Sequence, residues 1–150
     1  MPRANWYCSV VTINGTGVLI EGRSGAGKTS VALGLIDTAK ARGIAAALVS
    51  DDQSLIEVRE NRLFASAPAA IAGQAEIRGY GLAPIATVTE GRVGLVARLV
   101  PDEGIERMPE PKTVTVLGVE LPLVELPERH EQQSVRIVLA WLEANRPGPN

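Results

Sequence analysis

One short segment near the N-terminus constrains this sequence more than any other. Residues 22–29 read Gly-Arg-Ser-Gly-Ala-Gly-Lys-Thr, the pattern of a glycine, four residues and then Gly-Lys-Ser/Thr. The glycines let successive backbone N–H groups turn inward around phosphate oxygens, and a following helix points its positive end at the same anion. We therefore expect a phosphate-binding loop, or P-loop. The residues expected to bind the phosphates of a nucleotide are Gly22, Arg23, Ser24, Gly25, Ala26, Gly27, Lys28, Thr29 and Ser30.

The residues on either side of this segment have the periodicity of strands and of a helix. Residues 9–13 and 17–21 are apolar, β-branched runs separated by Asn14-Gly15, a dipeptide typical of a hairpin turn. From Val31 to Ala39 apolar residues recur every four positions, which predicts one buried helix face. Residues 45–49 form a short apolar run, typical of a strand buried on both faces. Together these segments predict a parallel, right-handed βαβ unit.

The remaining sequence predicts mostly strands. The expected elements are a hairpin over residues 55–58 and 62–65, a strand over 93–100, an exposed loop over 101–111, a strand pair over 113–117 and 119–121, a helix over 134–143 and a frayed tail over 147–150. A chain of 150 residues suits one compact domain. We therefore expect a single α/β domain over residues 1–150 with a mixed sheet.

Composition and charge argue against several classes of function. The net charge is −2 and no run of Lys or Arg is present, so a nucleic-acid partner is not expected. No apolar run approaches membrane-spanning length and the N-terminus lacks the apolar stretch of a secretory signal, so we expect no membrane partner and a cytoplasmic location. The single cysteine, Cys8, rules out a disulfide framework and a cysteine-based metal cluster.

Two carboxylates follow the strand that comes after the predicted helix. Asp51 and Asp52 directly follow Leu48-Val49-Ser50. In a parallel unit this end of the strand lies at the same edge of the sheet as the phosphate-binding loop. Phosphoryl transfer can use carboxylates there in two ways, one to hold Mg²⁺ and one to accept a proton from an attacking hydroxyl. An Asp-Asp turn or a helix cap is the structural alternative.

A third segment alternates charge around one apolar residue. It reads Glu76-Ile77-Arg78 and continues as Gly79-Tyr80-Gly81-Leu82. At strand spacing, Glu76 and Arg78 share a face. Spacing alone favours a surface ion pair over a functional role.

In this order, the three motifs resemble those of the HPr kinase/phosphorylase family, in its C-terminal catalytic domain. The segment from Glu76 to Leu82 is similar to the family signature Glu-Ile-Arg-Gly-x-Gly-Ile/Leu, and the resemblance runs from about Asn5 to the final helix. The length is similar to that of the short alpha-proteobacterial form, which lacks the N-terminal domain of long members. The resemblance implies a P-loop fold variant related to phosphoenolpyruvate carboxykinase.

The resemblance also implies an activity. The family transfers phosphate from ATP, or from pyrophosphate in some members, to a serine of HPr, the small phosphocarrier protein of the phosphotransferase system. The reverse reaction removes that phosphate with inorganic phosphate and releases pyrophosphate. An HPr serine kinase with ATP and Mg²⁺ as cofactors is therefore implied. Carried over residue by residue, the catalytic residues are Lys28, Asp51 (the proton acceptor), Arg78 and Arg107, and the metal-side residues are Thr29, Asp52 and Glu76.

Two departures from the family pattern change these expectations. The family usually has a histidine fifteen residues before the first glycine of the loop, where this sequence has Tyr7. A tyrosine stays neutral at pH 7, so Tyr7 can donate a hydrogen bond to Asp51 but cannot pass protons as a histidine does. We therefore predict a kinase with a weak reverse reaction. The alternatives are a Tyr7 packed beside Trp6, or a small insertion that shifts the register of the comparison. The resemblance implies a homo-oligomer. The C-terminal tail of long members is also missing, however, and this puts in question the hexamer that long members form.

Two other functions stay open from the sequence. A small-molecule P-loop kinase would share the loop, but such enzymes usually carry an arginine-rich lid, and none is evident here. A non-catalytic nucleotide sensor would need only binding. The presence of Lys28, Asp51 and Asp52 together argues against a site that only binds.

Overall fold

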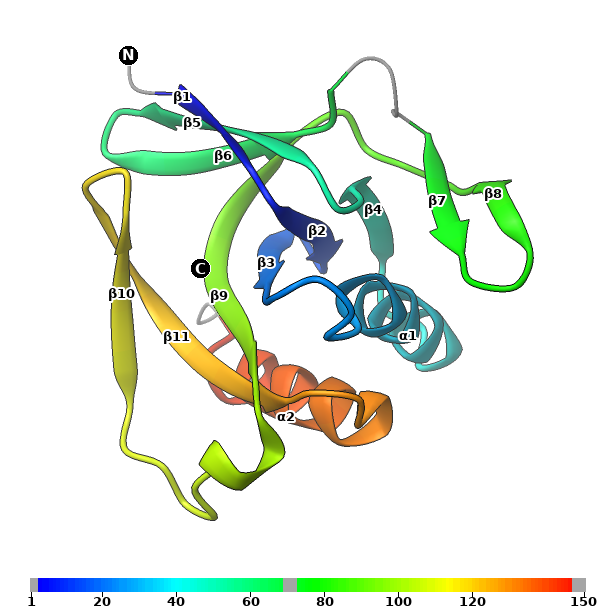
Figure 1. Ribbon diagram of the computed structural model, residues 1–150. Helices are drawn as coiled ribbons and strands as arrows, with labels where there is room; N and C mark the ends of the chain where they lie inside the picture. Colours follow the sequence, from blue (N-terminus) through cyan, green and yellow to red (C-terminus); the bar gives the residue numbers. More distant parts are fainter. Residues whose placement is uncertain (1–2, 69–72, 147–150) are drawn as a thin grey trace.

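The computed structural model describes residues 3–68 and 73–146 of the chain (Figure 1). Two helices pack on one face of a strongly curled mixed sheet, and a separate two-stranded hairpin projects from its edge. The elements are β1 (Arg3–Trp6), β2 (Cys8–Ile13), β3 (Thr16–Glu21), α1 (Lys28–Ala41), β4 (Ala46–Ser50), β5 (Ser54–Arg59), β6 (Arg62–Ser66), β7 (Gln74–Ile77), β8 (Gly81–Pro84), β9 (Gly91–Val100), the 3₁₀ turn η2 (Asp102–Gly104), β10 (Lys112–Val116), β11 (Val119–Pro127) and α2 (Glu131–Ala144).

The large sheet has an order that brings distant segments together. Along its main path the strands follow β1-β5-β6-β9-β3-β2-β4. β11 branches from this path by pairing with β9, and β10 pairs with β11. β3 and β11 each run parallel to β9, whereas the hairpin pairs are antiparallel. The expected α/β class with a mixed sheet is therefore confirmed.

The two strands of the predicted βαβ unit, β3 and β4, run parallel as predicted, but they are not neighbours in the sheet. β2 pairs antiparallel with both β3 and β4, so β3 and β4 run parallel to each other with β2 between them. The reason is the Asn14-Gly15 turn, which folds β2 directly against β3. The other edge of β3 is taken by β9, which leaves β4 to pair with the outer edge of β2.

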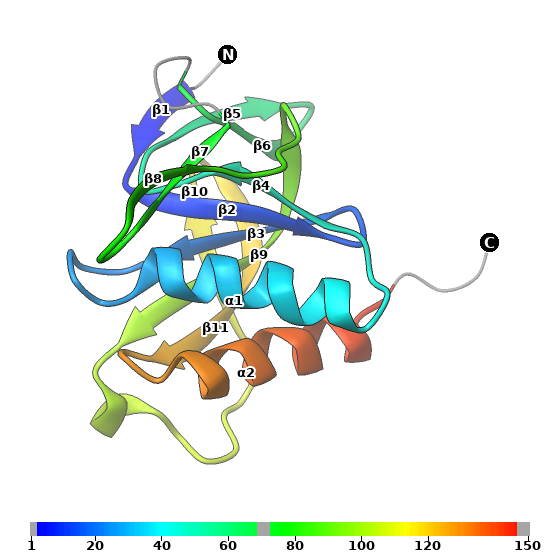
Figure 2. The same cartoon turned by 90° about the vertical axis from the view of Figure 1, so that its right-hand side faces the viewer.

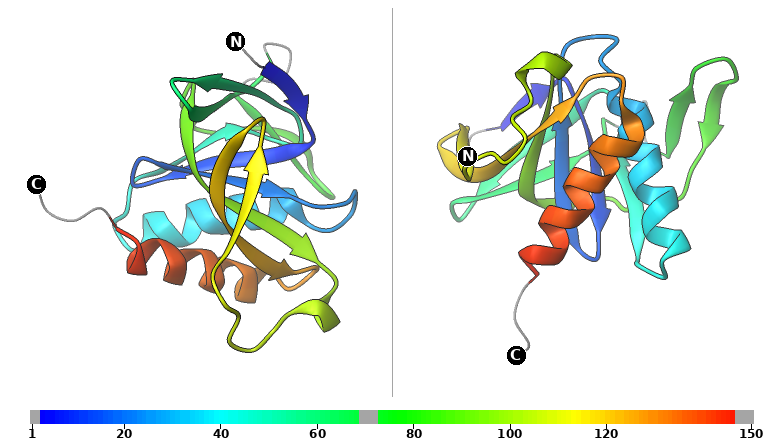
Figure 3. Two further views of the ribbon diagram at one scale, coloured as in Figure 1. Left: turned by 90° about the vertical axis from the view of Figure 1, so that its left-hand side faces the viewer. Right: turned by 90° about the horizontal axis from the view of Figure 1, so that it is seen from below.

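The central strands bury side chains on both faces. On one face, alternate residues of β2, β3 and β9 pack against α1 and α2, which lie side by side beneath the sheet (Figures 2 and 3). The other residues of the same strands, such as Val10, Leu19 and Val96, lie inside the curl against β5, β6, β10 and β11. Because the strands bury both faces, their sequences read as continuous apolar runs.

Most predicted elements are confirmed within one or two residues. The β2–β3 and β5–β6 hairpins, the strands β9 and β10 and the helix α1 form where periodicity indicated them, and α2 begins three residues earlier than expected. β11 continues six residues past its predicted end at Leu121, because its second half pairs in parallel with β9. Residues 101–111 are exposed, as predicted, except for the half-buried Ile105, and they include the short turn η2. The tail predicted over residues 147–150 lies outside the described residues. No helix in the described ranges has both the length and the apolar character needed to cross a membrane.

We predict that the close approach of β3 to β9 tolerates no side chain at Gly17. A Cβ there would lie 2.5 Å from the carbonyl oxygen of Arg92, which is backbone and cannot rotate away. Gly17→Ala should therefore lower the free energy of unfolding by about 1–3 kcal/mol, measured by urea denaturation.

Gly104→Ala is the matched control, because a Cβ at Gly104 would meet nothing within 4 Å. The urea concentration at the midpoint of unfolding should be nearly the same for Gly104→Ala as for the unchanged protein. Equal stability of the two variants would contradict the predicted packing.

Candidate active site

The glycine-rich loop lies between the end of β3 and the start of α1. Gly25 and Gly27 have φ of 81° and 105°, in the left-handed region that glycine adopts without strain. The N–H of Ala26 donates to the carbonyl of Arg23 at 3.1 Å, and the first bond into the helix runs from Val31 to Gly27. Within the described residues, the N–H groups of residues 28–30 donate to no backbone carbonyl. These donors and the positive end of α1 are free to bind an anion.

The ammonium group of Lys28 is held inside the loop. Its side chain is only 7% exposed, and Nζ donates to the carbonyl oxygens of Gly22 at 3.0 Å and Arg23 at 3.4 Å. Asp52 lies 4.0 Å from the same nitrogen and is largely exposed. A phosphate entering the loop would meet a lysine already in position, whose hydrogen-bond partners are neutral carbonyl groups and whose one nearby carboxylate among the described residues is the more distant Asp52.

Asp51 is the best-connected side chain of the site. Its Oδ1 accepts hydrogen bonds from the hydroxyl of Thr29 at 2.7 Å and of Ser9 at 3.0 Å, and its Oδ2 accepts one from the N–H of Glu76 at 3.2 Å. The carboxylate is 9% exposed. Burial of a charge is tolerated when several donors satisfy it. Asp51 is thus held beside Thr29, the residue that follows the loop lysine.

Ser9 is a site residue that sequence reasoning missed. Its hydroxyl is fully buried, donates to Asp51 and accepts from the N–H of Asp52 at 3.0 Å. Its position depends on the pairing of β2 with β4, where the register shifts between Val10 and Val11. The strand offered only a weak signal, because Ser9 and Thr12 are both hydroxyl residues among apolar ones. The contact that distinguishes Ser9 joins residues that are 42 positions apart.

Glu76 and Arg78 of the third motif do not lie where the strand spacing predicted. Glu76 lies in β7 and reaches Asp51 through its backbone N–H, while its side chain is exposed. Arg78 lies beyond the end of β7, in the turn before β8, so the two side chains do not share a strand face as predicted. The reason is the tight return of the chain, which pairs Ile77 with Gly81. No ion pair joins Glu76 and Arg78 in the described part of the chain.

One further expectation is wrong, and the role expected of Arg107 stays a prediction. Tyr7 is 72% exposed and donates no hydrogen bond to Asp51 among the described residues, so the expected bond is wrong; Ser9, two residues later, occupies that oxygen instead. The alternative of a packed Tyr7 is wrong as well, given the same exposure. Arg107 lies in the exposed loop 101–111, and no described contact joins it to Lys28 or Asp51.

The oxygen atoms near the loop suit a small hard cation. Thr29, Asp51 and Asp52 offer hydroxyl and carboxylate oxygens, the ligands that Mg²⁺ prefers. The described residues contain no group of three or more His, Cys, Asp or Glu arranged to hold a metal without help. Mg²⁺ usually keeps waters and binds through one or two carboxylates together with substrate phosphates. The residues present therefore fit Mg²⁺ bound jointly with phosphate, and do not fit a closed structural metal site.

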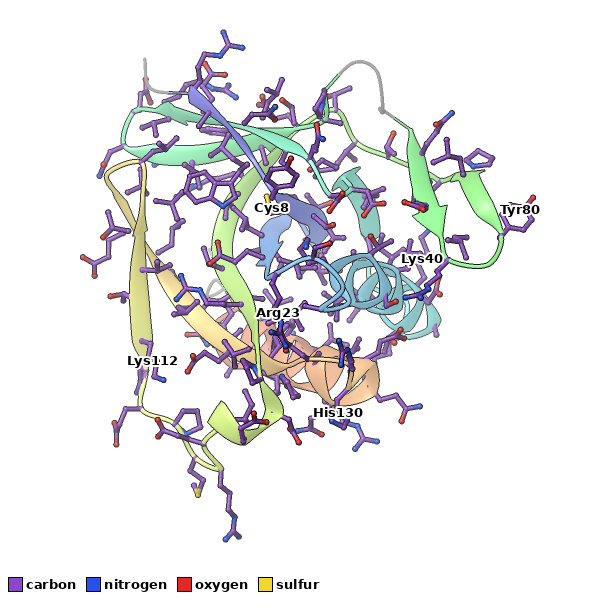
Figure 4. All side chains as sticks on the ribbon, in the orientation of Figure 1. Cys8, Arg23, Lys40, Tyr80, Lys112 and His130 are labelled. Atoms are coloured by element: carbon purple, nitrogen blue, oxygen red, sulfur yellow. The ribbon has the colours of Figure 1, made fainter. Side chains whose placement is uncertain are left out.

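The one cysteine has no chemical role in this arrangement. Burial of Cys8 raises the pKa of its thiol from the ordinary value of 9.0 to about 12, and a hydrogen bond involving Ser54 is a smaller, opposing effect. The thiolate is the reactive form of cysteine. Cys8 is therefore a neutral, packed residue beside the site (Figure 4).

Comparison with known proteins agrees with this geometry. The model of the family described as the HPr Serine kinase C-terminal domain matches residues 1–146, and the chain belongs to this family. It is 37% identical over 135 residues to the HPr kinase/phosphorylase of Chloroherpeton thalassium, covering 82% of this chain and 38% of that protein. It is also 37% identical over 134 residues to the HPr kinase/phosphorylase of Geobacillus kaustophilus, covering 80% and 40% of the two chains.

The fold matches a solved structure of the same family. The HPr(Ser) kinase/phosphatase from Coxiella burnetii aligns with a TM-score of 0.79 at 26% identity, covering 96% of this chain and 99% of that one. The resemblance inferred from the three motifs is thus confirmed. The chain spans about two fifths of the length of these two relatives, 38% of one and 40% of the other.

We predict that Ser9 and Asp51 are energetically coupled. In a double-mutant cycle, Ser9→Ala and Asp51→Asn should be non-additive, with a coupling energy of about 0.5–3 kcal/mol in the free energy of unfolding. The same cycle with Ser134→Ala in place of Ser9→Ala is the control, because Ser134 is also buried but its hydroxyl donates to the carbonyl of Pro127 and not to Asp51. Additivity in both cycles would show that Ser9 does not hold Asp51.

The raised pKa of Cys8 predicts a loss of stability at alkaline pH. Between pH 9 and 12 the unfolded chain releases the thiol proton while the folded chain retains it, so the free energy of unfolding falls as pH rises through this window. Cys8→Ala should show a shallower fall than the unchanged protein, measured by urea denaturation from pH 8 to 11. Parallel pH profiles would contradict the assignment.

Proposed function

We propose that residues 1–150 form a single catalytic domain that transfers the terminal phosphoryl group of ATP to a serine of HPr, with Mg²⁺. The observation that supports this best is the 2.7 Å hydrogen bond between Thr29, next to the loop lysine, and Asp51, at the end of β4. It joins a group suited to phosphate and metal with a group suited to proton transfer. The proposal includes a P-loop fold of the phosphoenolpyruvate carboxykinase type.

In the proposed mechanism the loop holds the donor. The free N–H groups of residues 28–30 bind phosphate oxygens, and Lys28 exchanges its carbonyl partners for the outer phosphates. Thr29 and Asp52 would hold Mg²⁺, which supplies charge neutralisation for the phosphates. On the β7–β8 hairpin, Glu76 would lie on the metal side and Arg78 would contact the phosphoryl group.

Asp51 accepts the proton. The serine oxygen of the acceptor forms a bond to the γ-phosphorus as the bond from that phosphorus to the bridging oxygen of ADP breaks, and the hydroxyl proton passes to Asp51. The three hydrogen bonds to Asp51 keep its carboxylate oriented while it accepts. Arg107, on the exposed loop 101–111, would approach the phosphoryl group only once the acceptor is bound.

We further propose that the reverse reaction is weak. Phosphorolysis needs a protonated Asp51 when inorganic phosphate attacks phosphoserine, and the exposed Tyr7 forms no contact through which it could return that proton. Because HPr is the proposed partner, we propose a cytoplasmic location. We also propose that the protein forms a homo-oligomer, which light scattering would measure.

The decisive experiment is to incubate the protein with ATP, Mg²⁺ and HPr of the same organism, and to weigh the HPr by mass spectrometry. One added phosphoryl group on a serine is the expected result. Asp51→Asn should transfer about 10²–10⁴ times more slowly while its affinity for MgATP stays near normal. Lys28→Ala should lose both binding and transfer.

Asp37→Asn is the matched control, because Asp37 is an exposed aspartate on α1. It should transfer at the normal rate. Phosphorylation of a small molecule with unmodified HPr would favour a small-molecule kinase, and binding of MgATP with no transfer to any acceptor would favour a nucleotide sensor.

A further inference from the structure

The side chain of Arg23, inside the loop, turns away from the phosphate-binding N–H groups. Its Nε donates to Glu128 Oε2 at 2.9 Å and its Nη2 donates to Glu128 Oε1 at 2.7 Å. Both distances are typical of charge-assisted hydrogen bonds, and together they form the bidentate (two-pronged) geometry that arginine and carboxylate prefer. Figure 4 shows Arg23 between the loop and the start of α2, on the side where His130 lies.

Glu128 belongs to a junction that is itself well anchored. It directly follows β11, and its N–H donates to the carbonyl of Val100, the last residue of β9. The next residue, Arg129, donates its N–H to the carbonyl of Ala26 in the loop at 3.4 Å. The loop is therefore joined to the β11–α2 junction by one side-chain pair and one backbone bond.

Burial in this pair is unequal. Glu128 is 8% exposed, whereas Arg23 is 66% exposed. A buried carboxylate without its partner is costly, so Glu128 holds Arg23 more strictly than a surface ion pair would. Glu128 also raises the pKa of Arg23, and Glu103 adds to the same effect, so the guanidinium stays charged.

We propose that Glu128 is a positioning residue that orders the phosphate-binding loop through Arg23, an inference that rests on the proposed function. The carbonyl of Arg23 accepts the N–H of Ala26 and lies 3.4 Å from Lys28 Nζ. Anchoring the side chain of Arg23 therefore fixes the carbonyl around which the loop turns and toward which the lysine points.

The physical reason is the cost of ordering a loop that contains three glycines. Glycine has the largest conformational freedom of any residue, so a loose loop would lose that freedom when phosphate binds. A loop already ordered by Glu128 avoids this loss, and its affinity for phosphate rises accordingly. An Arg23 that swung toward the phosphates would leave Glu128 buried and unpaired, so the geometry favours positioning over direct contact.

The test uses the full chain and calorimetric titration with MgATP and with magnesium pyrophosphate. Glu128→Gln and Arg23→Gln should each weaken binding of both ligands by about tenfold, and the double variant should bind no worse than the weaker single variant. At saturating MgATP, transfer to HPr should keep its rate, so the effect falls on KM and not on kcat. Arg59→Gln is the control, because it breaks another Arg–Glu pair, with Glu90, far from the loop.

A second readout needs no ligand. Hydrogen exchange at the N–H of Ala26, which bonds the Arg23 carbonyl, should be faster in Glu128→Gln than in the unchanged protein or in Arg59→Gln. If the glutamine variants fail to fold, Arg23→Lys and Glu128→Asp replace them, since both keep the charge but lose the two-pronged geometry.

The outcomes separate the two proposals. A protein that binds neither MgATP nor pyrophosphate refutes the proposed function, while faster exchange at Ala26 in the Glu128 variant would still support the ordering of the loop. A protein that binds both ligands, with unchanged affinity in Glu128→Gln, overturns the positioning role. Equal weakening by Arg59→Gln, or unchanged exchange at Ala26, overturns it as well.

Discussion

The hydrogen bonds to Asp51 determine where the parts of the site lie. The donors come from three different elements: the hydroxyl of Ser9 in β2, the hydroxyl of Thr29 in α1 and the backbone of Glu76 in β7. A carboxylate that is 9% exposed must be satisfied by such donors, because an unpaired buried charge would cost several kcal/mol. The same bonds that make burial of Asp51 possible therefore bring the loop, the central strand and the β7–β8 hairpin to one place. The proton transfer proposed for Asp51 and its role in the fold would therefore depend on the same hydrogen bonds.

The place of β2 in the sheet makes this convergence possible. In a simple βαβ unit the loop-bearing strand and the next strand are neighbours, about 4.8 Å apart. Here β2 separates β3 from β4, so the loop and Asp51 begin about two strand spacings apart. Two hydroxyl groups connect these positions: Thr29 donates to Asp51 from α1, and Ser9 donates to it from the intervening strand β2. The hairpin is held on the far side by the segment after β8, which pairs with Leu48 of β4.

The sequence predicted what depends on local pattern and missed what depends on pairing. The loop, Lys28, Thr29 and the helix after them follow from glycine spacing and a period of four, which are local properties. Asp51 was predicted because the end of a strand is visible in sequence. The contributions of Ser9 and Glu128 depend on contacts across 42 and 105 positions, and no local pattern carries that information. The place of Arg78 was wrong for a similar reason, since alternation along a strand says nothing about where that strand turns.

The glycine-rich loop is held from both sides by carboxylates that it does not itself contain. Asp51 holds its helical end through Thr29, and Glu128 holds its opposite flank through Arg23. Both residues also contact a segment that reaches the surface. The carboxylate of Asp51 accepts from the backbone of β7, whose hairpin carries the exposed Tyr80 at its tip (Figure 4). The backbone N–H of Glu128 donates to Val100, directly before the exposed loop 101–111. If an acceptor protein docks over the loop, these are the two surface segments that flank it. The path from either segment to the phosphate-binding groups would then run through a single buried residue, Asp51 on one side and Glu128 on the other.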